Sequence, residues 1–333
     1  MQLSDSQRTS REARPAGLPG ELVSDVLAAA TAAPSMHNTQ PWRFRVRHQA
    51  QAIDLRIDPG RTLKYGDPHG RAVHIACGAA LFNMRLAAAV AGREAAIQLL
   101  PDPGQPLLIA TVRLGAAHRA QAGERDLHAA IARRRTNRRP FSGRPVPPGV
   151  LAALAEAASL EGAIWHMLDR GETARVLELV REAERDQSAD PAYRAELAQW
   201  AGGARDSDGI PDSALGSRSP DSPAPVRDFA PGRPGPRSYE WFEESPQLVV
   251  LSMHADGRRD WLRAGQALQR VLLTATDRGI AASPLTQPLE TADAWLVRDP
   301  RTGIERPQMI LRIGYGLPVP ATPRRPVADV LDE

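Results

Sequence analysis

The amino-acid sequence predicts a fold of mixed helices and strands that is built from two related halves. Three observations support this. Helical and strand-like segments follow one another along the chain, a block of one helix and one strand recurs, and the composition is that of a globular protein. The 333 residues are 42% hydrophobic and 24% charged, which suits one large domain or two ordinary ones.

The first half is predicted to begin with a helix over residues 21–33, where apolar side chains recur at helical spacing until a proline ends it. Residues 42–47 and 53–57 alternate between apolar and polar side chains, which is typical of half-buried strands. A long helix rich in small residues is predicted at 74–91, and a further strand at 107–114.

The second half repeats this alternation of helix and strand. Helices are predicted at 126–135, 150–159 and 260–278, and strands at 164–168, 246–253 and 308–314. The N-terminal half is therefore expected to cover residues 21–122 and the C-terminal half residues 123–333, with residues 1–20 as a flexible arm.

One block of sequence occurs twice in diverged form, which indicates an internal duplication. Its helix opens with Gly-x-Ala-Leu, at Gly78 in the first copy and at Gly265 in the second. Each copy has a later strand that is rich in β-branched residues and ends in glycine, LIATVRLG and MILRIGYG. Alanine-rich helices can also resemble one another by chance, so a duplication needs support from further motifs.

Residues 202–238 interrupt the second half with seven prolines, six glycines and no apolar period. A stretch of this length is either a functional lid or a disordered insertion. Both interpretations stay open, and we favour a lid because the segments on both sides are predicted to fold.

Composition and charge exclude several classes of protein. There is no run of about 18 apolar residues, so no membrane-spanning helix is expected. The polar start lacks the apolar core of a secretory signal. A formal net charge of +3 is too small to indicate nucleic-acid binding. The single cysteine, Cys77, excludes an internal disulfide, and no cluster of histidines predicts a metal site. We expect a cytoplasmic protein.

Basic side chains gather at one place in the sequence. Of the 42 basic residues only Lys64 is a lysine, so any anion site must use guanidinium groups. Residues 132–141 (ARRRTNRRPF) hold five arginines together with Thr136. Planar arginine forks offer a phosphate dianion several charge-assisted hydrogen bonds. The cluster is therefore a candidate phosphate site, and the competing interpretation is a solvated helix end that binds nothing.

Residues 33–44 (APSMHNTQPWRF) are the most specific signal in the sequence. They resemble the Pro-Ser-x-x-Asn-x-Gln-Pro-Trp-x-Phe signature of the nitroreductase-like flavoproteins, in which this loop reaches from one subunit over the FMN of its partner. Residues 132–141 resemble the Arg-x-Ser-x-Arg phosphate helix of that family, with Thr136 in place of serine.

Two later segments extend the resemblance. Residues 282–290 (ASPLTQPLE) look like the loop along the N5 edge of the flavin, and residues 311–316 with the following PRRP look like the final strand and a basic phosphate clamp. The order of motifs is most similar to the Acg-type branch, in which two nitroreductase-like halves are fused. The resemblance implies an α+β, nitroreductase-like fold, with two similar mixed sheets flanked by helices and packed as an intramolecular pseudo-dimer around long central helices.

The resemblance also implies FMN as cofactor and a set of residues that bind it. These are Pro34, Ser35, Met36, Asn38, Gln40, Arg134, Arg135, Thr136, Arg138, Pro284, Leu285, Thr286, Gln287, Arg324 and Arg325. The spacing fits phosphate contacts by Arg134 with Arg138 or by Arg135 with Arg139, and both registers stay open. No Gly-x-Gly-x-x-Gly motif follows a strand, so NAD(P)H is expected only as a transient electron donor.

The two halves have lost complementary parts of this site. An alignment of their tryptophan-bearing strands puts Glu161 at the position of Asn38, so the second half lacks the ring-binding loop. The first half lacks an arginine cluster ahead of its first helix. We therefore predict one composite FMN site per chain, with the flavin ring under residues 34–38 and the phosphate on residues 134–138.

The resemblance implies FMN-dependent oxidoreduction, in which NAD(P)H reduces the flavin and the flavin reduces a nitro compound, a quinone or another small acceptor. One alternative is a flavin-binding or flavin-sequestering protein whose lid closes over FMN and allows little turnover. Another is an FMN enzyme gated by the lid for one small substrate. A small-molecule acceptor is the expected partner. The fused chain is expected to be a monomer, with a homodimer still open.

Some polar residues are interpreted as structural. Residues 64–71 (KYGDPHGR) are expected to form a turn around Gly66 and Pro68. His37 is interpreted as a loop residue that fills space, and Trp42 as a core residue.

Overall fold

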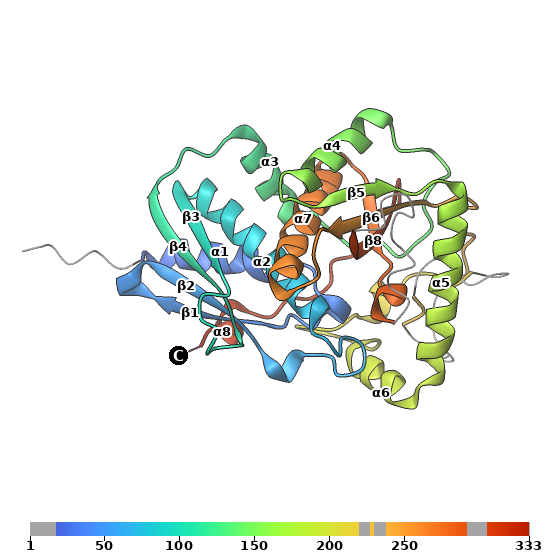
Figure 1. Cartoon of the computed structure of the whole chain (residues 1–333), viewed down its shortest axis with the longest axis horizontal. Helices are drawn as coiled ribbons and strands as arrows, with labels where there is room; N and C mark the ends of the chain where they lie inside the picture. Colours follow the sequence, from blue (N-terminus) through green and yellow to red (C-terminus); the bar gives the residue numbers. More distant parts are fainter. Residues whose placement is uncertain (1–17, 220–226, 230–237, 292–304, 333) are drawn as a thin grey trace, which may run out of the picture.

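The computed structural model describes residues 18–219, 227–229, 238–291 and 305–332 (Figure 1). Most of the predicted N-terminal arm and two parts of the predicted lid lie outside the described residues. The described chain forms two halves, each with one four-stranded sheet, and Figure 1 shows two long helices between the sheets.

The first half places its helices against a sheet with the strand order β1-β2-β4-β3. Its elements are α1 (Gly20–Thr31), β1 (Trp42–Arg47), β2 (Ala52–Ile57), α2 (Arg71–Val90), β3 (Arg93–Leu99) and β4 (Leu108–Ala117), with α3 (Ala122–Ile131) at the boundary between the halves.

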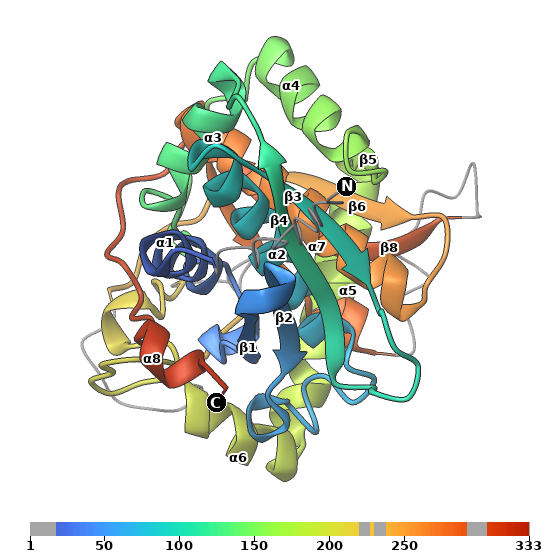
Figure 2. The ribbon, with the colours of Figure 1, turned by 90° about the vertical axis from the view of Figure 1, so that its left-hand side faces the viewer.

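The second half has a sheet with the corresponding order, β5-β6-β8-β7. Its elements are α4 (Pro148–Ser159), β5 (Ile164–Met167), α5 (Arg170–Ala189), α6 (Pro191–Trp200), β6 (Gln247–Met253), α7 (Arg258–Asp277), β7 (Ala281–Pro284), β8 (Arg306–Gly314) and α8 (Val327–Val330). Figure 2 shows that α8 returns to the first half, beside α1 and β1.

Every helix and strand predicted from the sequence is present, and the bounds agree best for the strongly periodic segments. The largest shift concerns α3, which ends at Ile131 and not at residue 135. The arginine cluster therefore follows the helix in an irregular segment. The expectation of mixed sheets is wrong, because all strand pairs within the two sheets are antiparallel. Among the described residues, parallel pairing is confined to isolated bridges such as Phe44 with Leu331.

Five elements were not predicted from the sequence, and one of them is α8, a helix of only four residues. β3 is an edge strand whose side chains alternate between half-buried and exposed, and β7 has only four residues. α5 buries one narrow stripe that includes Val176 and Val180, and α6 buries only Tyr193 and Leu197. Short or sparsely buried elements carry little of the apolar period on which a sequence-based prediction depends.

The two central helices cross where the duplicated motif places its glycines. A Cβ atom on Gly78 would lie 2.1 Å from the carbonyl oxygen of Leu262, and one on Gly265 would lie 2.1 Å from that of Ile75. The contact is reciprocal, as an approximate two-fold axis between the copies requires. Together with the matching strand orders, it confirms the predicted duplication and the fused, two-half architecture.

α2 is apolar because it is central. Among the described helices it is the one long and apolar enough to cross a membrane by length and composition, whereas the sequence predicts none. However, 89% of its most apolar window is buried inside the protein. A helix that is apolar all round and packed on several sides is typical of a protein core.

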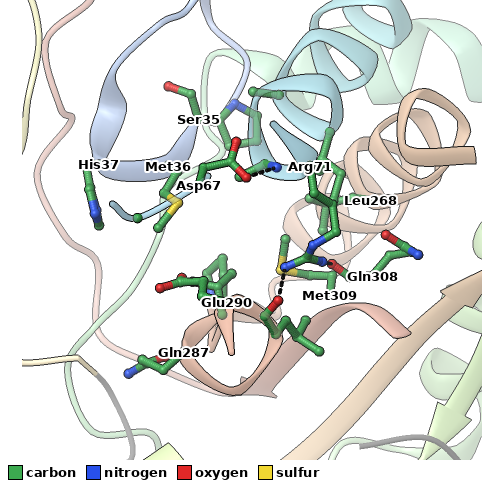
Figure 3. A pocket seen from close by; sticks show the side chains of 18 of the residues that line it. Ser35, Met36, His37, Asp67, Arg71, Leu268, Gln287, Glu290, Gln308 and Met309 are labelled. Atoms are coloured by element: carbon green, nitrogen blue, oxygen red, sulfur yellow. Dashed lines mark hydrogen bonds between the residues drawn. The ribbon is translucent and has the colours of Figure 1, made fainter. Parts of the chain in front are cut away.

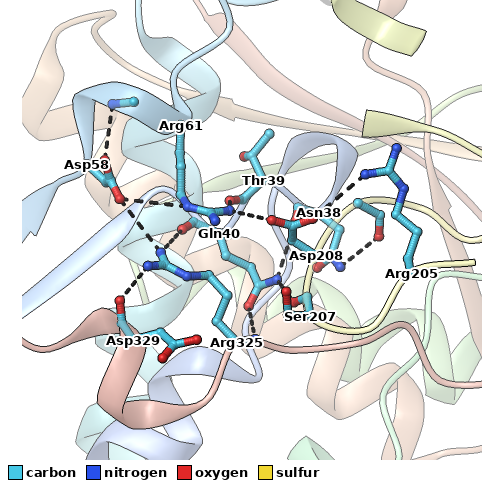
Figure 4. A network of polar contacts seen from close by, with 12 residues as sticks. Asn38, Thr39, Gln40, Asp58, Arg61, Arg205, Ser207, Asp208, Arg325 and Asp329 are labelled. Atoms are coloured by element: carbon cyan, nitrogen blue, oxygen red, sulfur yellow. Dashed lines mark hydrogen bonds and ion pairs between the residues drawn. The ribbon is translucent and has the colours of Figure 1, made fainter. Parts of the chain in front are cut away.

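The segment between β5 and β6, residues 168–246, is called the insertion below, and it joins the second half to the first. The Glu196 carboxylate on α6 accepts hydrogen bonds from the backbone amides of residues 64–66. Further along the insertion, Asp208 pairs with Arg61 of the first half at 2.9 Å (Figure 4). These contacts hold the start of the predicted lid against the first half.

The glycine crossing generates a test of the fused architecture. Gly78→Ala should lower the free energy of unfolding by at least about 1–3 kcal/mol, because a methyl group there meets backbone that cannot move independently. The control is Gly123→Ala in α3, where a Cβ atom meets nothing within 4 Å. That variant should be neutral or stabilised by up to about 1 kcal/mol. Equal urea midpoints for the two variants would contradict the helix contact.

Candidate functional site

A cavity of about 700 Å³ lies between the two halves. Its walls come from the loop of residues 34–37, from α2 and α7, and from β7 and the residues that follow it. Arg71 reaches from α2 across the cavity toward Gln308 and Met309 (Figure 3). The volume falls in the range of about 300–1,000 Å³ that small-molecule and cofactor pockets occupy.

A smaller cavity of about 230 Å³ adjoins the first. Both are lined by Pro34, Ser35, Thr136 and Arg138. The smaller cavity is also lined by Arg134, Arg135 and Arg324. The site therefore consists of a larger cavity of mixed polarity and a smaller basic cavity, which share one wall.

The arginines of the small cavity are buried or half-buried, and none of them forms an ion pair with an acid among the described residues. Arg134 is only 5% exposed, and its Nε atom, like that of Arg324, has no hydrogen-bond partner. Burial, followed by the charges of Arg324, Arg135 and Arg138, lowers the pKa of Arg134 to about 9. Burial and then Arg135 lower the pKa of Arg324 to about 10. Buried cations in this state are stabilised by a bound anion.

Arg138 joins the basic cavity to the insertion. Its guanidinium lies 4.7 Å from the centre of the Phe229 ring and donates a hydrogen bond to the carbonyl of Ala214 at 2.9 Å. Burial, then the charge of Arg227, lowers the pKa of Arg138 to about 10. None of Arg134, Arg138 and Arg324 forms an ion pair with an acid among the described residues.

The neighbouring arginines are engaged elsewhere. Arg135 is half-buried, and its guanidinium donates to the carbonyls of Ala132 and Arg134. Arg139 pairs with Glu240. Of the two registers that the spacing left open, Arg134 with Arg138 contains the one buried arginine of the cluster and no ion pair with a described acid, whereas Arg139 of the other register is ion-paired.

The loop that follows α1 has an unusual backbone. His37, Asn38 and Gln40 adopt φ values of 52°, 57° and 51°, a left-handed conformation that non-glycine residues seldom take. Ser35 supports it, because its Oγ accepts a hydrogen bond from the Gln40 amide at 2.9 Å. Strained backbone of this kind persists where surrounding contacts enforce it, and it is concentrated at functional sites.

Asn38 holds the loop to two distant segments. Its Nδ2 donates to the carbonyl of Gly209 at 2.9 Å and to that of Pro323 at 3.0 Å, while its Oδ1 accepts from Arg324 at 3.0 Å. The insertion and the C-terminal segment therefore meet at this side chain. Asn38 thereby positions one arginine of the basic cavity.

His37 is buried at the wall of the larger cavity. Its ring meets the Phe229 ring edge-on, with the centres 5.7 Å apart. Burial, then the charges of Arg227 and Arg138, lowers the pKa of His37 well below its usual value. The imidazole is therefore neutral at pH 7.

The sequence matches the model of the nitroreductase family over residues 5–59 and 131–315. The chain belongs to the nitroreductase family. It is 37% identical over 321 residues to a Mycobacterium tuberculosis protein provisionally named NAD(P)H nitroreductase Rv3131, with 94% of this chain and 91% of that protein covered. It is 32% identical to another protein of that organism, provisionally named NAD(P)H nitroreductase acg, with coverage of 93% and 95%.

Solved structures of nitroreductases are also similar to this chain. One is a nitroreductase with bound FMN from Bacteroides fragilis, which has a TM-score of 0.37 and 16% sequence identity. The match covers 60% of this chain and 92% of that one.

In this member of the nitroreductase family, most of the residues predicted to bind a cofactor lie at the joined cavities. The larger cavity is lined by Pro34, Ser35, Met36, Thr136, Arg138, Pro284, Thr286 and Gln287, and the smaller one adds Asn38, Arg134, Arg135 and Arg324. The structure thus brings residues 34–38 of the first half together with residues 134–138 of the second.

Three residues of the predicted set, Gln40, Leu285 and Arg325, line neither cavity. Leu285 is fully buried in the apolar core of the second half. Gln40 is also fully buried, and its Oε1 accepts from the Arg325 amide at 2.8 Å. The Arg325 guanidinium lies 3.7 Å from Asp58 (Figure 4). Gln40 and Arg325 therefore anchor the C-terminal segment to the first half.

The cavity wall also includes residues outside the predicted set. Residues 66–69 form the expected turn, and they line the cavity as well. Arg71 at the start of α2 donates to the carbonyls of Leu289 and Gln308. Arg227 and Glu290 form a buried ion pair at 2.9 Å. The polar residues at 64–71 could have predicted this part of the cavity wall from the sequence. No sequence pattern could have predicted the ion pair of Arg227 with Glu290, because the two residues are far apart in the chain.

The burial of His37 generates a pH prediction. Below about pH 6.5 the unfolded chain gains a proton at this histidine and the folded chain does not, so stability falls with pH by up to about 1.4 kcal/mol per unit. His37→Asn, a residue tolerated at this φ, should remove that part of the slope. Urea unfolding at pH 7.5 and 5.5 measures it. An identical loss of stability in variant and wild type would contradict a buried, neutral His37.

Proposed function

We propose that this chain binds one molecule of FMN in the two joined cavities and acts as an FMN-dependent oxidoreductase. The observation that carries the proposal is the basic cavity, where the Nε atoms of Arg134 and Arg324 are buried without a hydrogen-bond partner and neither side chain forms an ion pair with a described acid. A phosphate dianion suits planar guanidinium groups. Membership of the nitroreductase family supports FMN as the molecule that carries this phosphate.

In the proposed complex, Arg134, Arg138 and Arg324 hold the phosphate and the Thr136 hydroxyl adds a donor. The larger cavity holds the flavin ring, with residues 34–36 on one side and residues 284–287 on another. Arg138 lies on the wall shared by both cavities, so its charge also favours the anionic form of a reduced flavin. When bound, FMN supplies two-electron redox chemistry at its N5 atom.

The residues of the chain orient the reactants and exclude water. Met36, His37 and Phe229 cover one region of the cavity wall. We propose NAD(P)H as the electron donor and a nitro compound, a quinone or another small molecule as the acceptor. The names of the two mycobacterial relatives support the donor. The neutral His37 can donate one N–H or accept one hydrogen bond, and it brings no positive charge to the site.

We propose a single FMN site and a monomeric chain. The α2–α7 contact already joins two halves of the kind that a dimer would bring together. At the second inter-half position, Glu161 stands where Asn38 stands in the first, and it is ion-paired with Arg85 and Arg270. Glu161 thus neutralises charge that a phosphate at this position would need.

One observation favours a second candidate function, in which the protein sequesters FMN with little turnover. Arg227 and Phe229 of the insertion line the cavity, and Arg227 is held by its buried ion pair with Glu290. An insertion anchored in this way covers part of the space in which nicotinamide or an acceptor would stack on the flavin.

The proposed phosphate site predicts opposite effects on binding and stability. Arg134→Met should weaken FMN binding by about ten- to a hundredfold, the value of a charge-assisted hydrogen bond. It should also raise the stability of the FMN-free protein, because an uncompensated buried charge is removed. Arg133→Gln, at a neighbouring exposed arginine, is the control and should change neither quantity.

Flavin titration should saturate at one FMN per chain, and a ratio near two would contradict the single site.

Anaerobic reduction distinguishes the two candidate functions. If the protein is a reductase, NADH or NADPH should bleach the bound FMN of the wild type within seconds to minutes. Bleaching only in Phe229→Ala, which opens the cavity wall, would indicate that the insertion limits access. Bound FMN that neither protein can reduce would rule out the oxidoreductase and leave sequestration.

A further inference from the structure

A second groove lies between the halves, separate from the two cavities described above. Its volume is about 460 Å³. It is lined by Arg85 of α2, by alternate residues of β3, by residues 160–162 after α4, and by Arg263 of α7. The volume is again within the range of ligand pockets, about 300–1,000 Å³.

This groove occupies the position that the duplication assigns to a second copy of the main cavity. Placing Gly78 on Gly265 also places Ala76 on Arg263 and Arg85 on Leu272. Ala76 and Leu272 line the main cavity, and Arg263 and Arg85 line the groove. In the same way, β7 lines the main cavity, while its counterpart β3 lines the groove. The two sites are therefore related by the pseudo-two-fold axis.

The different residues at these equivalent positions make the groove more basic than the corresponding part of the main cavity. Two apolar positions of the main cavity are arginines here. Arg85 is ion-paired with Glu161 at 2.7 Å and also donates to Gln266 at 3.1 Å. The same Glu161 pairs with Arg270 at 2.8 Å. One carboxylate is thus shared by two arginines.

Arg263 also lines the groove, but it does not take part in this network of ion pairs. It is exposed and forms no ion pair or hydrogen bond with another of the described residues. Counting it with Arg85 and Arg270 against Glu161, the groove carries excess positive charge. Among the described residues that line the groove, no second arginine is unpaired, so the charge of the groove suits a monoanion better than a phosphate dianion.

The rest of the groove is apolar. Ile97 and Leu99 of β3 are half-buried along it, and Met253 is buried at its wall. Leu160 at its rim is 64% exposed, one of the few large apolar side chains left open to solvent. An apolar surface with one free guanidinium is complementary to a ligand that has an apolar body and one anionic end.

We propose that this second groove binds a small amphipathic carboxylate, with the carboxylate on Arg263 and the apolar body on Leu99, Leu160 and Met253. This inference does not rest on the proposed function, because it involves neither FMN nor turnover.

Titration of the full-length chain with 2-naphthoate, followed by calorimetry, tests the proposal. One equivalent should bind saturably, and Arg263→Gln should weaken binding about tenfold, the effect of losing one charge-assisted hydrogen bond. Arg278→Gln is the matched control, since this arginine is exposed at the other end of α7. It should leave the affinity unchanged. Leu160→Ser should weaken binding without altering the fold, because the side chain is exposed.

Further measurements separate the groove from the main cavity. Saturating FMN should not displace 2-naphthoate, and the neutral 2-naphthamide should bind much more weakly. Absence of saturable binding, displacement by FMN, or equal affinity in Arg263→Gln and wild type would each overturn the proposal. If the chain does not bind FMN, the Arg263 and Leu160 variants still decide the question.

Discussion

The close contact between α2 and α7 at Gly78 and Gly265 is the constraint on which the rest of the structure depends. Each glycine lies so near the opposite backbone that no side chain fits between the helices. The two sheets and the loops at the helix ends therefore have one fixed relative position. The main cavity exists because of that position, since it takes one wall from each helix and brings residues 34–37 of one half toward β7 of the other.

The basic cavity is a feature of this arrangement that costs stability. Arginines buried without acids destabilise a folded chain, and three of them meet here from two distant parts of the sequence. Their positions are held by neutral groups, such as the Asn38 side chain that accepts from Arg324. Asn38 also binds the insertion through Gly209. Hydrogen bonds of Asn38 thus connect three parts of the site, which are the loop at the larger cavity, the basic cavity and the insertion.

Duplication followed by divergence has made the two inter-half sites unequal. At one, small and apolar residues of the central helices leave room for a ring, and the insertion supports the loop above it. At the other, Arg85 and Arg263 replace those residues, and Glu161 binds two arginines. The insertion occurs in one half only, and its anchors on residues 64–66 reach only one of the two sites.

The sequence alone determined the elements with a strong local period, the duplication, the family and most residues of the candidate site. Those signals are local, because apolar spacing and short motifs lie within a few turns or strands of chain. Only the tertiary structure decided that Gln40 and Arg325 anchor a segment, that Arg134 is the buried arginine of its cluster, and that Arg227 meets Glu290 at the cavity. Such outcomes depend on which distant side chains share a buried space, and that depends on how the halves and the insertion pack, which no local pattern encodes.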